Sequence, residues 1–444
     1  MLLKGIEAGV RAAGRDDVRL IDAWIGGVCG DKVVHEAVNW RPDVVVIQPH
    51  PVDPQDGLDL AAAVKRAVAC TVVAVGPAVE LHPGAMRPPE SAVDLALPGE
   101  SERAVLDVLD RLRGAEPGQR GVVLQKPVHP RQLSGEELEA LPFPTYTLCE
   151  SLAYASTSYP IRMAAPARWG FVLSGRGCPH GCLFCSPVTR KSSGRALRLR
   201  RAANVVDEIE HLIANGVNVV SFEDDDLTAS RDHVAGICRE MVRRRLAIRW
   251  ICHARVDELD VELMGHMAGA GCALLRLGVE SGSEQVLERL NKNPRRIPWR
   301  ESCLAVFAHA RRLGIATNAL VILGNPDETR DEVNRTIDLV LDLDPDLVQA
   351  HFFMPYPGST AADHFRHLVP SNQAARLHHY GLPVVNLSRM TLDELREARS
   401  RLYRRFFARP SFLARHAWLY WRFYLANPGV ARHLLRGFAR IQST

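Results

Sequence analysis

Three closely spaced cysteines are the residues with the clearest capacity for chemistry. Cys178, Cys182 and Cys185 form the pattern C-x3-C-x2-C in the segment GRGCPHGCLFC, directly after an apolar run over residues 170–174. Thiolates in a glycine-rich loop are ligands for iron–sulfur clusters, and three of them leave one iron of a four-iron cluster open to another molecule. Zinc is the alternative, and it requires a fourth ligand, for which His180 is the nearest candidate. The spacing favours the iron–sulfur cluster.

Polar residues follow the later apolar runs, and each has a chemical and a structural interpretation. The acidic residues 223–226 could bind a cation or cap the next helix. Arg255 could bind a carboxylate or pair with Asp257, while His253 could be catalytic or a core histidine. Glu280, which precedes Ser-Gly, could bind a ligand or belong to a turn.

Strand-like and helix-like segments alternate through the middle of the chain. We expect strands over residues 170–174, 217–222, 249–253, 274–279, 316–323 and 347–353, and helices over 203–214, 232–244, 259–270, 284–290, 300–313 and 330–343. This rhythm predicts a partial (β/α)6 barrel with its active site at the carboxyl ends of the strands.

The segments before and after this barrel predict two further regions. Apolar runs at 18–22, 43–47, 71–75 and 93–97, with helices at 58–69 and 100–112, predict an α/β, doubly wound, Rossmann-type sheet. A proline-rich stretch then predicts a linker. The predicted domains are 1–115, 116–165 (linker), 166–358 (barrel) and 359–444, a helical C-terminal region rich in arginine and aromatic residues.

The cysteine pattern and the segments that follow the other strands resemble the radical S-adenosylmethionine (radical SAM) superfamily. The segments are FEDDD at 222–226, WICHARV at 250–256, GVESG at 278–282, ILGNPDET at 322–329 and FMPYPG at 353–358. The resemblance covers residues 170–358. It implies that Cys178, Cys182 and Cys185 hold a [4Fe-4S] cluster, which reduces bound S-adenosylmethionine (SAM) to a 5'-deoxyadenosyl radical that abstracts a substrate hydrogen.

The resemblance also assigns SAM contacts to residues past the strand ends. These are Phe184 and the backbone of Ile322 and Gly324 at the adenine, Glu223 and Asp224 at the methionine amino group, Arg255 at its carboxylate, and Glu280 and Ser281 at the ribose hydroxyls.

The N-terminal region resembles the cobalamin-binding domain of many radical SAM enzymes, through VGP at 75–77 and PGE at 98–100. The chain starts at what resembles the first helix of that domain, so we expect the opening strand and its loop to be missing and a bound corrin to be exposed. The sequence therefore favours chemistry without cobalamin, and cobalamin binding is the alternative.

Without cobalamin, we expect radical 1,2-diol dehydration of a small polar natural-product intermediate, as in the aminoglycoside (apramycin-type) diol-dehydratases. General acids would help to expel water, and the candidates are Asp225, Asp226, His253 and Tyr356. With cobalamin, the expected reaction is C-methylation. An electron-transfer or structural iron–sulfur protein is the alternative of another class.

Composition limits the partners. The 444 residues carry a formal charge of +4, which is too small to indicate a nucleic-acid partner. No apolar run is long enough to span a bilayer, so we expect a cytoplasmic protein. Electrons would come from a flavodoxin- or ferredoxin-type donor, and an NAD(P)H-dependent reductase would complete a deoxygenation. The C-terminal helices are expected to lie on the barrel, on a partner or on a membrane surface.

Overall fold

The computed structural model describes residues 2–14, 17–22, 29–51, 53–86, 91–113, 132–147, 163, 165–185, 194–356, 358–368, 383, 385–429 and 432. The chain divides into two compact units. Unit 1 comprises residues 1–145, 185–198 and 356–377, and unit 2 comprises residues 146–184, 199–355 and 378–444. The predicted linker lies largely outside the described residues.

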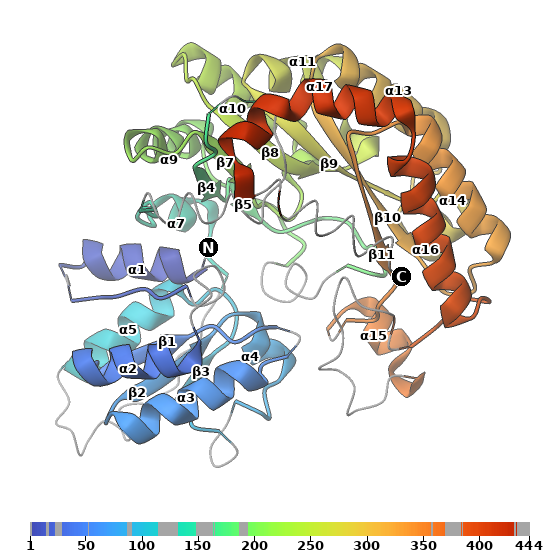
Figure 1. The fold of residues 1–444 in the computed structure, drawn as a ribbon. Coiled ribbons are helices and arrows are strands. Elements are labelled where there is room, and N and C mark those ends of the chain that lie inside the picture. The colour runs from blue at the N-terminus through green and yellow to red at the C-terminus, as the bar shows by residue number, and fades with distance from the viewer. Residues whose placement is uncertain are drawn as a thin grey trace. The chain divides into compact units, whose positions relative to one another are not determined.

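Unit 1 contains a parallel sheet in the order β1-β2-β3, with helices on both faces (Figure 1). One face packs against α1 and α5, and the other packs against α3 and α4. The strands are β1 (Val44–Ile47), β2 (Thr71–Val75) and β3 (Leu95–Leu97), and the helices are α1 (Leu2–Ala12), α2 (Gly30–Trp40), α3 (Gln55–Ala67), α4 (Pro77–Leu81), α5 (Glu102–Arg113), α7 (Gly135–Glu139) and α15 (Thr360–His364). The predicted α/β layering with helices on both faces is therefore present.

The predicted strand at 18–22 is wrong. Residues 17–22 form no regular structure, because their contacts go to neighbouring helices rather than to a sheet edge. The backbone oxygen of Val18 accepts a hydrogen bond from Arg11 of α1, and the Arg19 guanidinium lies 5.3 Å from the ring centroid of Trp40 in α2. Helices α2 and α4 were not predicted.

Unit 2 contains the predicted partial barrel. Its six strands are all parallel and lie in the order β11-β10-β9-β8-β7-β4. They are β4 (Trp169–Val172), β7 (Val219–Phe222), β8 (Arg249–Ala254), β9 (Cys272–Glu280), β10 (Ala316–Leu323) and β11 (Leu347–Phe352); the short strands β5 (Gly175–Arg176) and β6 (Arg198–Leu199) precede the first barrel helix. Each barrel strand lies within three residues of its predicted ends, so this part of the fold prediction is confirmed.

Helices connect the barrel strands and cover the outer side of the sheet (Figure 1). They are α9 (Ala202–Ala214), α10 (Arg231–Arg243), α11 (Val261–Gly269), α12 (Glu284–Arg289), α13 (Trp299–Arg312) and α14 (Arg330–Leu343). Because parallel strands joined in this way have their carboxyl ends at one edge, the segments after β4, β7, β8 and β9 lie side by side.

Two C-terminal helices belong to the same unit as the barrel. In α16 (Leu392–Phe407), Leu402 and Phe406 are fully buried in the barrel's core. In α17 (Pro410–Ala426), Phe423 packs on residues near the amino ends of the strands, including Trp169 and Ala316. The prediction that these helices lie on the barrel is confirmed.

The apolar face predicted for these helices is only partly buried. Leu413, Trp418 and Leu425 of α17 are 52%, 78% and 74% exposed. These residues point away from the barrel because the face that carries Phe423 is the one that packs on it. Contact of this outer face with a membrane surface stays a prediction. Among the described residues, no helix has the length and apolarity needed to cross a bilayer.

Candidate active site

The cysteine loop (residues 177–185) follows β4 and is held by two neighbouring segments. The carboxylate of Asp225, past the end of β7, accepts a hydrogen bond from the Gly177 amide at 3.2 Å. After α12, the Leu290 carbonyl accepts from the Leu183 amide at 2.9 Å, and the Asn291 side chain donates to the Gly181 carbonyl at 3.0 Å. These bonds fix the loop on both sides of Cys182, so its sulfur has a defined position.

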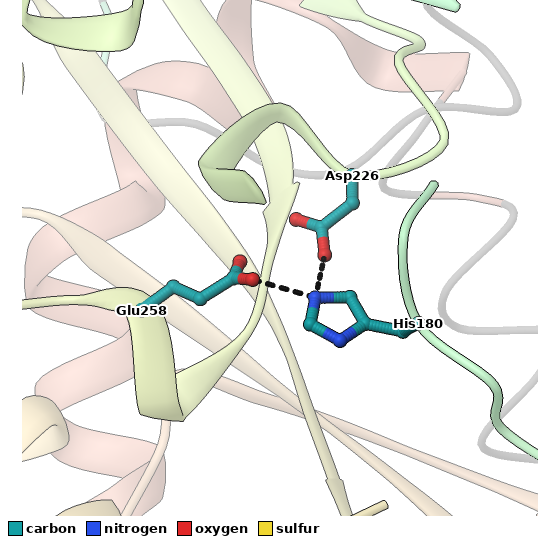
Figure 2. Close-up of side chains that lie close together, drawn as sticks. All are labelled: His180, Asp226 and Glu258. Carbon is teal, nitrogen blue, oxygen red and sulfur yellow. Dashed lines mark hydrogen bonds and ion pairs between the residues drawn. The ribbon is translucent and has the colours of Figure 1, made fainter. Parts of the chain in front are cut away.

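His180 forms a second anchor of this loop (Figure 2). Its Nε2 lies 2.6 Å from Glu258 Oε1 and 3.4 Å from Asp226 Oδ2. Hydrogen bonds to Asp226 and Glu258 raise the pKa of His180. Burial opposes ionisation of Asp226, but the bonds from His180 and Thr228 outweigh it and lower the pKa of Asp226. The three side chains could hold a divalent cation, but the ion-paired hydrogen bonds already satisfy them.

This geometry weakens the zinc alternative, because the His180 Nε2 bonds to two carboxylates. Cys182 is buried, while Cys178 and Cys185 are partly exposed. Cys185 belongs to unit 1, whereas Cys178 and Cys182 belong to unit 2. The grouping of the three cysteines therefore rests on their spacing along the chain. Phe184, the predicted adenine neighbour, is partly exposed.

Arg255 contacts the Cys182 sulfur. Its Nη1 lies 3.5 Å from Cys182 Sγ, while Nε and Nη2 each donate to a carboxylate oxygen of Asp257 at 3.0 Å. Burial alone would lower the pKa of Arg255. The hydrogen bonds to Asp257 and its negative charge outweigh burial, so the pKa of Arg255 is raised. The structural alternative, pairing with Asp257, is therefore present. The predicted contact with the SAM carboxylate stays a prediction.

A second buried cation lies beside this cysteine. The Lys292 ammonium is 3.0 Å from the Glu280 carboxylate, and both side chains are less than a tenth exposed. Burial lowers the pKa of Lys292, but the charge of Glu280 outweighs it and raises that pKa. Arg255 and Lys292 therefore place two buried positive charges near the Cys182 sulfur. This environment fits a Cys182 that ligates a cluster.

Glu280 and Ser281, the predicted ribose contacts, have partners inside the protein. Glu280 has a left-handed backbone (φ 62°) at the end of β9, a conformation that is strained for glutamate. A Cβ at Gly278 would lie 2.5 Å from the Glu280 carboxylate, so the ion pair occupies the space that a side chain at residue 278 would take. The Ser281 hydroxyl lies 3.1 Å from that of Thr336. Their roles toward SAM stay predictions.

The first two acidic residues after β7 differ in environment. Asp224 is buried and accepts hydrogen bonds from the hydroxyl and amide of Ser174 at 2.6 and 3.1 Å. Burial raises the pKa of Asp224 to about 7 despite these bonds. The carboxylate of Glu223 is about one-third exposed, accepts from the Ser221 hydroxyl and pairs with Arg276 at 3.4 Å.

The four predicted general acids are not equivalent. Asp226 has a lowered pKa and is ionised near pH 7, so it lacks the proton that a general acid needs. Burial and the charge of Arg276 lower the pKa of His253 to about 3, so its imidazole is neutral. Tyr356 is counted with unit 1, and burial raises its pKa. Asp225 holds the cysteine loop.

The turn after β10 contains a buried carboxyl group that the sequence analysis missed. Glu328 Oε2 accepts from the amides of Gly324 and Asn325 at 2.7 and 2.9 Å, and its Oε1 has no hydrogen-bond partner among the described residues. Burial raises the pKa of Glu328 to about 7. The Ile322 carbonyl accepts from the Asn325 side chain at 2.8 Å. The expected adenine-contact segment is thus a rigid turn.

Lys292 and Glu258 were also missed. Lys292 lies in the polar segment NKNP, which is typical of an exposed turn, and nothing in its local pattern indicates burial. Glu258 follows Asp257 in a short polar stretch that is typical of a helix start. Lys292 and Glu258 reach the site only because of the order of the strands in the sheet, which the local sequence does not contain.

Comparison with known proteins agrees with this geometry. Residues 172–340 match the model of the radical SAM superfamily. The chain is 25% identical over 440 residues to an uncharacterized methyltransferase of Pyrococcus horikoshii, covering 96% of this chain and 90% of that protein. It is 26% identical over 426 residues to an anaerobic magnesium-protoporphyrin IX monomethyl ester cyclase of Rubrivivax gelatinosus. That match covers 91% of this chain and 73% of the cyclase.

The fold is similar to a solved radical SAM methyltransferase, TsrM from Kitasatospora setae, whose structure holds cobalamin and a [4Fe-4S] cluster. The TM-score is 0.66 at 18% identity, with 82% of this chain and 71% of that chain covered.

Proposed function

We propose that this chain, a radical SAM enzyme by its matched domain, also binds cobalamin and transfers a methyl group to a small polar substrate. The observation that carries the proposal is similarity across both units to a protein named as a methyltransferase, over 96% of this chain. The proposal reverses the preference drawn from the sequence, which favoured diol dehydration without cobalamin.

The cysteine loop supports the iron–sulfur part of the proposal. Cys178, Cys182 and Cys185 would hold the cluster, and the buried Arg255 guanidinium contacts the Cys182 sulfur. When bound, the cluster supplies the single electron that cleaves SAM, and the corrin supplies the methyl group. The protein's own part is to fix the loop through Asp225, His180 and the segment after α12.

The carboxyl edge of the unit 1 sheet supports the cobalamin part. Gly76 and Gly99 follow β2 and β3 with positive φ values of 85° and 76°. A Cβ at Gly76 would lie 3.1 Å from the Gln48 side chain, past the end of β1. Ligands of doubly wound sheets bind at the carboxyl ends of the strands. The two glycines place main-chain atoms rather than side chains of their own at this edge, where the corrin would bind.

Diol dehydration without cobalamin is the second candidate. Doubly wound sheets bind their ligands at the point where the strand order reverses. The described strands of unit 1 lie in the order β1-β2-β3, without such a reversal, and this observation favours dehydration. In that case the substrate would be an aminoglycoside-type intermediate, as the sequence suggested, and the NAD(P)H-dependent reductase would be needed. Both candidates need a flavodoxin- or ferredoxin-type electron donor.

The test separates these reactions before the substrate is known. The full chain is reconstituted anaerobically with iron and sulfide, then incubated with dithionite and SAM, with and without hydroxocobalamin. We expect the protein to retain the corrin through gel filtration and to form S-adenosylhomocysteine and methylcobalamin only when the corrin is present.

Three results would count against the proposal in different ways. Formation of 5'-deoxyadenosine by protein that retains no corrin would favour dehydration. An intact cluster without any SAM cleavage would favour an electron-transfer or structural role. Cys182→Ala should abolish SAM cleavage, whereas Cys29→Ala, at an exposed cysteine in unit 1, should leave it unchanged; equal activity in both variants would contradict the cluster assignment.

A further inference from the structure

The Arg255 guanidinium is directed at the Cys182 sulfur by the rest of its hydrogen bonds. Nε and Nη2 bind the two oxygens of Asp257 side by side, and Nη2 also donates to the Lys292 carbonyl at 2.7 Å. The Arg255 amide donates to the Thr228 hydroxyl at 3.1 Å. A planar guanidinium held along one edge has a fixed orientation. Its Nη1, 3.5 Å from Cys182 Sγ, is therefore held against the sulfur.

The site is buried, so this contact is electrostatically strong. Arg255 is 5% exposed and Cys182 is 7% exposed. Charges interact more strongly where water is excluded. Lys292 adds a second positive charge near the same sulfur, although Glu280 pairs with it. Hydrogen bonds and charge at cysteine sulfurs are among the factors that set the reduction potential of iron–sulfur clusters.

We infer that Arg255 is a positioning and tuning residue, which donates to the Cys182 thiolate and raises the reduction potential of the cluster held there. Reduction adds one negative charge, which a neighbouring guanidinium stabilises. Asp257 fixes the guanidinium and, being negative, offsets part of its effect. The inference rests on the cluster of the proposed function and gives Arg255 a role other than binding the SAM carboxylate.

The test is a redox titration of the reconstituted full chain, followed by the electron paramagnetic resonance signal of the reduced cluster, without SAM or substrate. At the wild-type midpoint, Arg255→Gln should lower the ratio of reduced to oxidised cluster at least tenfold, which for one electron is about 59 mV. Asp257→Asn removes the opposing charge and should raise that ratio. A purely structural role would not shift the two variants in opposite directions.

A matched control is available in the same sheet. Arg276 is also a buried arginine, but its hydrogen bonds go to Ser221, Phe222 and Glu223. Arg276→Gln should change the ratio less than Arg255→Gln does. Equal shifts in the two variants would overturn the inference.

The outcomes also distinguish this inference from the proposed function. If Arg255→Gln binds no cluster, Arg255→Lys is used instead. Lysine keeps the positive charge, so the ratio of reduced to oxidised cluster should decrease less. Unchanged ratios in the Arg255 and Asp257 variants, or shifts in one direction, would overturn the inference while leaving SAM cleavage by the wild type intact. A wild type that binds no cluster would overturn both.

Discussion

The buried ion pair between Lys292 and Glu280 gives a direct test of the site's architecture. Lys292→Met removes the ammonium that lies 3.0 Å from the Glu280 carboxylate, at a position with 6% side-chain exposure. The carboxylate then stays buried without its partner. We expect the variant to lose stability because an uncompensated charge in the barrel is costly.

The expected magnitude follows from burial. Breaking a buried pair by removing one partner costs about 3–5 kcal/mol, whereas replacing both partners by apolar residues is often close to neutral. Lys292→Met should therefore lose about that much, and the double variant Lys292→Met/Glu280→Met should recover most of it. The exposed pair Arg296–Glu288 serves as the control, since its side chains are 81% and 68% exposed. Glu288→Gln should cost no more than about 1 kcal/mol.

Urea unfolding of the cluster-free protein, followed by tryptophan fluorescence, measures these differences. The buried Trp299 indole donates to the Val279 carbonyl at 3.0 Å, next to Glu280, so its emission reports on this region. If Lys292→Met unfolds at the same urea concentration as Glu288→Gln, the ion pair is not buried as described and the reasoning fails. Failure of the double variant to recover stability would show instead that Met packs poorly there.

Three further predictions concern stability. The folded pKa of Asp224, about 7, lies above its ordinary value of 3.8, so the penalty for burying its charge grows between about pH 4 and pH 7. The stability of Asp224→Asn relative to the wild type should therefore rise across that window, by up to about 4 kcal/mol. A pH-independent difference in urea unfolding would contradict this. A Cβ at Gly282 would lie 2.4 Å from a main-chain oxygen of α14, so Gly282→Ala should lower the free energy of unfolding by about 1–3 kcal/mol or more. Gly265 has open space around it in α11, so Gly265→Ala should raise that free energy by about 0.5–1 kcal/mol. Equal thermal midpoints for the two variants would count against the geometry. Phe423→Ala should cost about 3–5 kcal/mol and Trp418→Ser less than about 0.5 kcal/mol, because the first is 1% exposed and the second 78%; the reverse order in thermal melts would mean that α17 packs by its other face.

The barrel could be predicted because its local signals agree. Strand β9 (Cys272–Glu280) is a nearly continuous apolar run between a Gly and a Ser-Gly turn, as expected of a parallel strand buried on both faces. Helix α2 (Gly30–Trp40), which buries only Ala37 in its span, was not predicted. The segment 18–22 is apolar in sequence but joins no sheet in the described residues, and its Ile21 is exposed.

The cysteine ligands could be predicted from spacing, but the groups that control their charge could not. Arg255 and Cys182 are 73 positions apart and meet only because β8 follows β7 and β4 in the sheet. Lys292 lies 12 positions after Glu280 and returns to it through α12. Such contacts depend on strand order and register, which single-residue patterns do not contain.

The acidic run after β7 shows how far four similar residues diverge once the fold places them. Asp224 bonds to Ser174, Asp225 to the Gly177 amide and Asp226 to His180, so these three carboxyl groups secure the segments around the cysteine loop. Glu223 keeps a partly exposed carboxylate that accepts from the Ser221 hydroxyl and forms an ion pair with Arg276, on the strand two positions away in the sheet. An ammonium group can compete for a carboxylate that is solvated and singly ion-paired far more readily than for one that is buried and bonded twice. We therefore expect the methionine amino group of SAM to bind at Glu223 rather than at Asp224, which makes Glu223→Gln the substitution in this run that should weaken SAM binding, measured by equilibrium dialysis, without loosening the loop.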